Sequence, residues 1–80
     1  MNVYLVEMFD DNGIEKVRSC GVQAVCASLD AVDAWARETY KDARRCEHND
    51  RAWNIWIDGK ESDFVLVAME HTVYAMEEVI

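Results

Sequence analysis

One stretch constrains the fold of this chain most: residues 28–46, SLDAVDAWARETYKDARRC, have the periodicity of an amphipathic helix. Its apolar residues recur at steps of three and four and therefore share one stripe. They are Leu29, Val32, Ala36, Tyr40 and Ala43. Ser28 suits the N-cap, and Arg44 and Arg45 suit the negative end of the helix dipole. A helix of this length is marginal alone in water, so the stripe must pack on another element.

The first half of the chain predicts a β-hairpin before this helix. Residues 3–9 are rich in strand formers, and Asp10-Asp11-Asn12-Gly13 follows as a turn sequence. The return strand is expected to begin at Ile14, with extended chain continuing to residue 27. Gly21 indicates a bulge or a break in this strand.

The second half predicts another hairpin. Residues 53–57 alternate between apolar and polar, and residues 58–63 form the connection. Residues 64–69 are a nearly continuous apolar run, which is typical of a central strand covered on at least one face. Residues 71–80 fit either a helix or a strand, and a strand is favoured.

These elements predict one α+β domain over residues 1–80. A single helix packs on one face of a four- to five-stranded antiparallel sheet, in the order ββαββ(β). The 19-residue helix is about as long as a strand of about seven or eight residues, so it should cross the sheet once. The second hairpin then lies beside the helix N-terminus. This arrangement predicts an acidic pole consisting of Asp30, Asp33, Asp58, Glu61 and Asp63.

The charge of the chain limits its partners. Sixteen acidic and eight basic residues give a formal net charge of −8. Phosphates would be repelled, so direct binding to nucleic acid or to an anionic membrane is not expected. A basic protein partner is compatible with this charge, although negative charge also serves solubility alone. A domain of 80 residues has a small core, which leaves a homodimer open.

Cysteine usage and the absence of targeting signals indicate the cytoplasm. The three cysteines, Cys20, Cys26 and Cys46, are odd in number and lack CxxC spacing, which favours reduced thiols. No stretch has the features of a signal peptide, and no apolar run approaches the length of a membrane span.

Metal binding and catalysis are weakly indicated. Cys46 and His48 lie two residues apart, but zinc sites normally have paired, closely spaced ligands. His48 near Asp50, and Glu70 beside His71, offer acid-base groups without a nucleophile motif or a phosphate-binding loop. We therefore expect no catalytic residues, no metal, no cofactor and no enzymatic activity.

The tryptophans are more informative. Trp53 and Trp56 point to opposite faces of one predicted strand, so a single helix can cover only one of them. In the simplest interpretation both belong to the core or its margin. The alternative is that Trp56 is an aromatic anchor at an interface, where tryptophan is enriched.

This small α+β chain has no catalytic motif, and several of its acidic residues lie on predicted turns and at a helix start. They are Asp30, Asp33, Asp58, Glu61 and Asp63. In these respects the chain resembles the phage-encoded antagonists of bacterial defence, anti-CRISPR proteins among them. The resemblance covers the general character of the whole chain. It implies a non-enzymatic inhibitor that occupies the nucleic-acid-binding surface of a basic protein. The alternative is a structural module that forms homo-oligomers through an edge strand or an exposed aromatic face.

Overall fold

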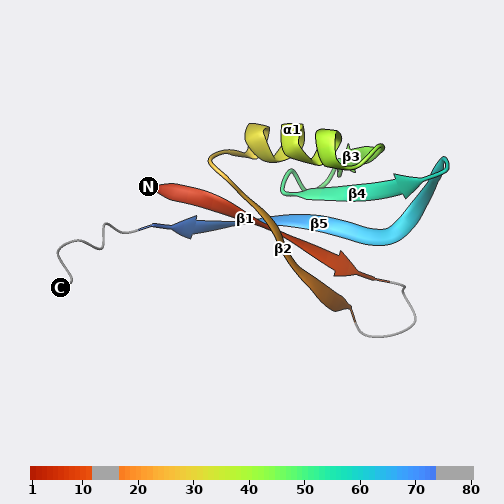
Figure 1. Cartoon of the computed structure of the whole chain (residues 1–80), viewed down its shortest axis with the longest axis horizontal. Coiled ribbons are helices and arrows are strands. Elements are labelled where there is room, and N and C mark those ends of the chain that lie inside the picture. Colours follow the sequence, from red (N-terminus) through yellow and green to blue (C-terminus); the bar gives the residue numbers. More distant parts are fainter. Residues whose placement is uncertain (12–16, 74–80) are drawn as a thin grey trace.

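The computed structural model describes residues 1–11 and 17–73, which form one antiparallel sheet with a helix on one face (Figure 1). In chain order the elements are β1 (Asn2–Asp10), β2 (Arg18–Cys26), α1 (Leu29–Thr39), β3 (Ala43–Arg45), β4 (Ala52–Ile57) and β5 (Lys60–Thr72). The five strands lie in the order β2-β1-β5-β4-β3, and each neighbouring pair is antiparallel. The predicted α+β class and its single helix are confirmed.

The central strand is β5, which lies between β1 and β4. It contains the apolar run of residues 64–69, as the sequence predicted, and its 13 residues make it the longest element in the described chain. The strand extends to Thr72, so residues 71–72 belong to a strand. Val73 follows the end of the strand, and residues 74–80 of the ambiguous stretch lie outside the described residues.

The first hairpin is present as the antiparallel pair β1 and β2, and the predicted start of the return strand, Ile14, lies outside the described residues. The described return strand begins at Arg18, and the Asn12-Gly13 turn lies outside the described residues. The pairing of β1 with β2 shifts between Val6 and Glu7 and again between Met8 and Phe9. Gly21 has φ of +92°, a conformation that glycine adopts without steric cost. The bulge predicted at Gly21 therefore lies next to the second shift.

The predicted helix over residues 28–46 is too long. Ser28 is the N-cap, and its side chain accepts a hydrogen bond of 3.1 Å from the Ala31 amide, as predicted. The helix ends at Thr39, and Tyr40 caps it in an extended conformation. The chain then forms β3, a strand of three residues that pairs with β4. Pairing with β4 satisfies backbone groups that a further helical turn would have satisfied internally.

The core lies between α1 and the sheet. Val32 and Ala36 are the fully buried positions of the helix stripe, and Trp53 and Leu66 are the largest buried side chains beneath them. The buried cluster consists of Val6, Val32, Ala36, Ala43, Trp53, Ile55, Leu66 and Ala68. The helix has only 11 residues and is about 16 Å long, so it cannot cover the full length of β5, which is about 43 Å.

Candidate functional site

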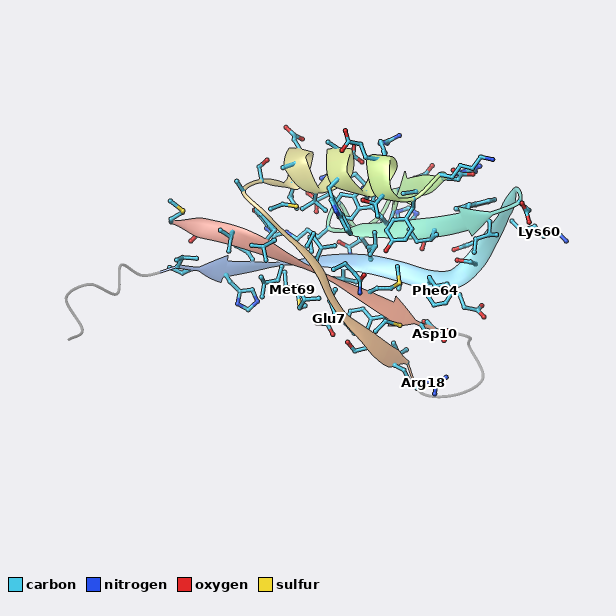
Figure 2. All side chains as sticks on the ribbon, viewed as in Figure 1. Glu7, Asp10, Arg18, Lys60, Phe64 and Met69 are labelled. Atoms are coloured by element: carbon cyan, nitrogen blue, oxygen red, sulfur yellow. The ribbon has the colours of Figure 1, made fainter. Side chains whose placement is uncertain are left out.

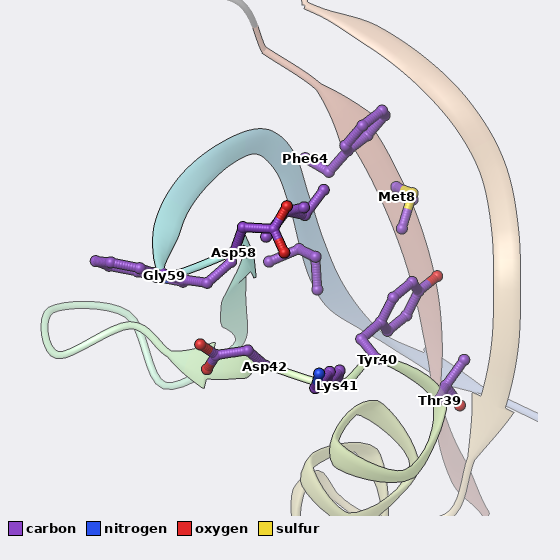
Figure 3. Close-up of a pocket in the computed structure, with 11 residues that line it drawn as sticks. Met8, Thr39, Tyr40, Lys41, Asp42, Asp58, Gly59 and Phe64 are labelled. Carbon is purple, nitrogen blue, oxygen red and sulfur yellow. The ribbon is translucent and has the colours of Figure 1, made fainter.

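The main cavity lies where the short helix leaves the sheet uncovered, between the end of α1 and the β4–β5 hairpin (Figure 3). Its volume is about 670 Å³. Its lining residues come from β1, from the last residue of α1 and the segment that follows it, and from both strands of the β4–β5 hairpin and the turn between them. They are Met8, Thr39, Tyr40, Lys41, Asp42, Ile55, Trp56, Ile57, Asp58, Gly59 and Phe64. We call this space the hairpin-end cavity.

The floor of the hairpin-end cavity is apolar because it belongs to the helix-facing side of the sheet. Met8 and Phe64 lie on the partly buried margin of the core, and Ile55 is buried within it. Ile57 comes two residues further along β4 and is 53% exposed. The cavity can therefore take an apolar group, which would cover side chains that the helix does not reach.

Tyr40 closes the helix side of this cavity. Its ring meets Trp35 edge to face, with ring centroids 6.0 Å apart. Burial, followed by the nearby Cys20 thiol, raises the pKa of the Tyr40 phenol. The hydroxyl therefore stays protonated near neutral pH and can donate a hydrogen bond to a bound group.

The other side carries charge. In Figure 3, Asp42 and Asp58 stand on the hairpin side, opposite Met8 and Tyr40. The Arg44 guanidinium donates two hydrogen bonds of 3.0 Å to Asp42, and these hydrogen bonds hold the pKa of the Asp42 carboxyl below its usual range. Asp58 is exposed in the turn. The cavity is thus an apolar space with carboxylates beside it.

The turn that presents Asp58 forms for a local reason. Asp58 has φ of +53° and Gly59 has φ of +78°, and the flanking residues Ile57 and Lys60 are paired. Asp-Gly is favoured in two-residue hairpin turns that need positive φ at both positions. The hairpin predicted after residue 57 is therefore confirmed, but its connection has two residues and not the six, 58–63, that the sequence predicted, because residues 60–63 already belong to β5.

The predicted acidic pole is not assembled. Asp30 borders a small depression with Asn2 and Tyr4 at the start of α1. Asp58 instead lines the hairpin-end cavity with residues 39–42, which follow the end of α1. The prediction was wrong because β3 reverses the chain once more before β4, which puts the hairpin beside the C-terminal end of the helix (Figure 1).

The five predicted carboxylates therefore separate into two groups. Asp58, Glu61 and Asp63 remain together on the hairpin and the start of β5, and all three are exposed. Asp33 is occupied within its own chain, because it accepts hydrogen bonds from Trp53 Nε1 at 2.8 Å and from Arg37 Nε at 3.0 Å. Its role in the fold is structural.

The two tryptophans of β4 differ in burial, as their alternation predicted. Trp53 is fully buried beneath the helix. Trp56 is partly exposed, and the Arg44 guanidinium carbon lies 3.8 Å from the centroid of its ring. This distance is short enough for a cation–π contact. Trp56 therefore already has a partner in its own chain on one side of the ring.

Met8, Tyr40 and Asp42 are cavity residues that the sequence analysis did not identify as site residues. Tyr40 was assigned to the helix stripe, and the cavity exists only because the helix ends before it. No local pattern marks these residues, since the cavity depends on where the helix stops relative to the sheet.

The cysteines and histidines do not converge on a site. Cys20, Cys26 and Cys46 are free thiols, and burial raises the pKa of Cys26. Over residues 1–11 and 17–73, no group of three or more His, Cys, Asp or Glu side chains could hold a metal ion. None of the residues that line the hairpin-end cavity is a cysteine or a histidine.

Comparison with models of protein families, with curated proteins and with solved structures finds no match to this chain. Within the part of the chain that the structure describes, α1 is too short and too polar to cross a membrane.

Proposed function

We propose that this chain is a non-enzymatic binding protein that docks on a basic protein surface through the hairpin-end cavity. The observation that carries the proposal is the combination of an apolar cavity of about 670 Å³ with Asp42 and Asp58 in its lining. Such a site fits an apolar side chain that has lysine or arginine neighbours. Burial of the apolar side chain supplies affinity, and the carboxylates supply orientation.

Glu61 and Asp63 add negative charge on the first residues of β5, at positions that alternate with the cavity residue Phe64 and therefore point to the other side of the strand. Both are exposed, so they can meet a second row of basic side chains without moving other groups. Lys41 and Lys60 lie among these carboxylates and reduce the local charge. We therefore assign most of the binding energy to the apolar cavity. The negative charge of the hairpin favours the approach of basic partners over acidic ones.

The finer proposal is that the partner handles nucleic acid and that the chain inhibits it. A surface built to bind phosphates presents lysine and arginine, which the net charge of −8 attracts and which the hairpin carboxylates can contact. A chain bound there would exclude nucleic acid from the same surface. This is the role that the resemblance to anti-CRISPR proteins implies.

A synthetic peptide tests the docking step. The probe is a peptide of about twelve residues with two leucines flanked by lysines and arginines, titrated into ¹⁵N-labelled protein. We expect amide shifts at Tyr40, Ile57 and Phe64, and affinity that falls as salt rises from about 50 to about 500 mM because the charges are screened. A peptide with glutamates in place of the basic residues should not bind.

Charge reversal provides the matched comparison. Asp58→Lys, Glu61→Lys and Asp63→Lys together should weaken peptide binding by about tenfold or more, since they replace attraction by repulsion. The control combines Asp30→Lys, Glu47→Lys and Asp50→Lys, which make the same change in charge at exposed positions away from the hairpin. Equal affinity for the two triple variants, or shifts that map elsewhere, would contradict the proposed site.

The finer proposal needs a nucleic-acid-handling partner. For a basic partner captured by the immobilised chain, we expect the wild-type chain to displace labelled nucleic acid in a mobility-shift assay. The hairpin triple variant should do so at about tenfold higher concentration or not at all. Simultaneous binding of the chain and the nucleic acid would refute inhibition by occupancy while leaving the docking site in place.

A further inference from the structure

The face of the sheet opposite α1 is apolar. Val6, Leu66 and Ala68 are buried on the helix-facing side, so the alternate positions of β1 and β5 point to the opposite side. We call the apolar residues on that side the open face. They are Val3, Leu5 and Phe9 on β1, Val65, Val67 and Met69 on β5, and Val22 and Val25 on β2.

No described element covers the open face. In Figure 2 the side chains of Glu7 and Met69 lie on the side of the ribbons away from α1. Val22 is 53% exposed and Val25 is 61% exposed. The apolar residues of β1 and β5 on this face are partly exposed, whereas their neighbours on the helix side are buried or packed on the core.

This composition is unusual for a face in contact with water. An antiparallel sheet with one solvated face normally alternates apolar and polar residues. In β5, residues 64–69 are all apolar, and Val65, Val67 and Met69 supply the half that does not face the helix. The outer side of α1 does carry polar residues, including Arg37 and Glu38. A contiguous apolar patch on a molecule whose other outer surface is polar is typical of an interaction site.

We infer that the open face is the interface of a homodimer, in which two copies pack sheet against sheet about a two-fold axis. Three strands spaced about 4.8 Å apart, each paired over about nine residues, give a flat footprint of roughly 430 Å² per copy. The accessible surface of a corrugated face is larger than its footprint. Two copies therefore reach the area of about 1,000 Å² that a specific interface needs.

Pairing through the sheet edges is a poorer route to a dimer. The edge strand β2 shifts its register twice against β1, and Gly21 sits at the second shift, so its outer backbone groups do not form a regular ladder. The other edge, β3, has three residues and carries Arg44 and Arg45. These features protect the edges, whereas on β1, β2 and β5 the middle of the open face carries one charged residue, Glu7, and the polar residues Asn54 and Arg44 lie beside it on β4 and β3.

Glu7 is the charged side chain in the middle of the open face, whereas Asp63 lies at its end, and Glu7 already has a partner. The Ser19 hydroxyl donates a hydrogen bond to its carboxylate. In a two-fold dimer the Glu7 carboxylates of the two copies lie near the axis, since Glu7 pairs with Val67 near the middle of the β1–β5 ladder. Their repulsion weakens the dimer without preventing it.

Sedimentation equilibrium between about 10 μM and about 1 mM tests this inference. We expect a mass approaching twice the chain mass of 9.2 kDa at high concentration. Association should tighten at about 500 mM salt, because screening reduces repulsion between two chains of net charge −8. Binding to a basic partner at the hairpin should weaken with salt, so the two proposals fail separately.

Variants locate the interface. Val67→Lys and Val25→Lys each should weaken association by at least about tenfold, because a buried lysine would lack a partner. Val25 is exposed in the single chain, so its replacement leaves the fold intact. Ala34→Lys adds the same charge on the exposed side of α1 and should not change association. Glu7→Gln should tighten it several-fold.

A mass of 9.2 kDa at about 1 mM in high salt would overturn the inference, and so would equal association of the Val25→Lys and Ala34→Lys variants. A dimer that Glu7→Gln leaves unchanged or weakens would overturn the proposed placement of the two-fold axis.

Discussion

The indole Nε1 of Trp53 donates a hydrogen bond of 2.8 Å to Oδ1 of Asp33, which ties β4 to the helix above it. Trp53 is fully buried, so its N–H has no access to water. Oδ2 of the same carboxylate accepts from Arg37 Nε at 3.0 Å. The carboxylate is therefore part of the packing between helix and sheet.

Removing this acceptor should destabilise the fold. We expect Asp33→Ala to lower the free energy of unfolding by about 1–3 kcal/mol, because the buried indole N–H loses its partner. Asp33→Asn should cost less, since the amide oxygen can still accept. Urea unfolding measures both, with Asp30→Ala as the control at an exposed position of the same helix. Equal losses for Asp33→Ala and Asp30→Ala would contradict this role.

The same contact predicts a dependence on pH. The hydrogen bond from Trp53, aided by Arg37, lowers the pKa of Asp33 below its unfolded value of about 3.9. A lowered pKa contributes stability that is complete above the unfolded value and is lost as the pH falls through the folded value. The difference in unfolding free energy between wild type and Asp33→Asn should therefore be constant from about pH 6 to 7 and should shrink below about pH 4. A difference that grows on acidification would contradict it.

Local patterns predicted the elements that local forces determine. Ser28 was identified as a helix cap, Asp58-Gly59 as a hairpin turn and residues 64–69 as a central strand, and the structure confirms all three. Each depends on neighbours within a few residues along the chain, or on a run of apolar side chains that only a central position can bury.

The third strand could not be predicted in this way. Ala43 fits the helix stripe by spacing, but in the structure it pairs with Ile55 on β4 and is buried there. The Trp56 amide donates to the Asp42 carbonyl at 2.8 Å, which extends the same pairing. These contacts join residues more than ten positions apart, so periodicity does not reveal them. The β4–β5 hairpin consequently lies beside the C-terminal end of the helix and not beside its N-terminus, so the five carboxylates of the predicted acidic pole do not lie together.

The helix cap offers a second stability test. Ser28 accepts from the Ala31 amide at 3.1 Å, and Ser28→Ala removes that acceptor. We expect a loss of about 1 kcal/mol in unfolding free energy. Ser28→Asp should retain most of the stability because a carboxylate can accept the same hydrogen bond and favours the positive end of the helix. Thermal unfolding of the two variants separates these outcomes, and an equal loss in both would argue against a capping role.

Substitution of Gly59 in the β4–β5 turn should destabilise the fold because of the backbone conformation alone. Gly59 has φ of +78°, and a Cβ added there meets nothing within 4 Å. Gly59→Ala should therefore destabilise the fold by about 1–2 kcal/mol through backbone strain, without a clash. Gly59→Asn should cost less, because asparagine tolerates positive φ. Chemical unfolding compares the two, and a neutral Gly59→Ala variant would show that the turn relaxes to another conformation.

Arg44 contacts both the cavity carboxylate of Asp42 and the ring of Trp56. Its removal should therefore change the titration of Asp42 and the indole signal of Trp56. Its guanidinium donates two hydrogen bonds to Asp42 and lies over the Trp56 ring. Because those hydrogen bonds lower the pKa of Asp42, Arg44→Ala should raise the titration midpoint of Asp42 toward about 3.9, followed by carboxyl ¹³C NMR.

Arg44→Lys is the informative companion variant. A lysine keeps the positive charge but cannot form the paired hydrogen bonds or stack on the ring, so the Asp42 midpoint should lie between those of wild type and Arg44→Ala. The Trp56 indole signal should shift in both variants, because both remove the guanidinium from the ring face. If Arg44→Lys reproduced the wild-type midpoint, charge alone would set the pKa of Asp42, and the cavity carboxylate would need no specific arginine.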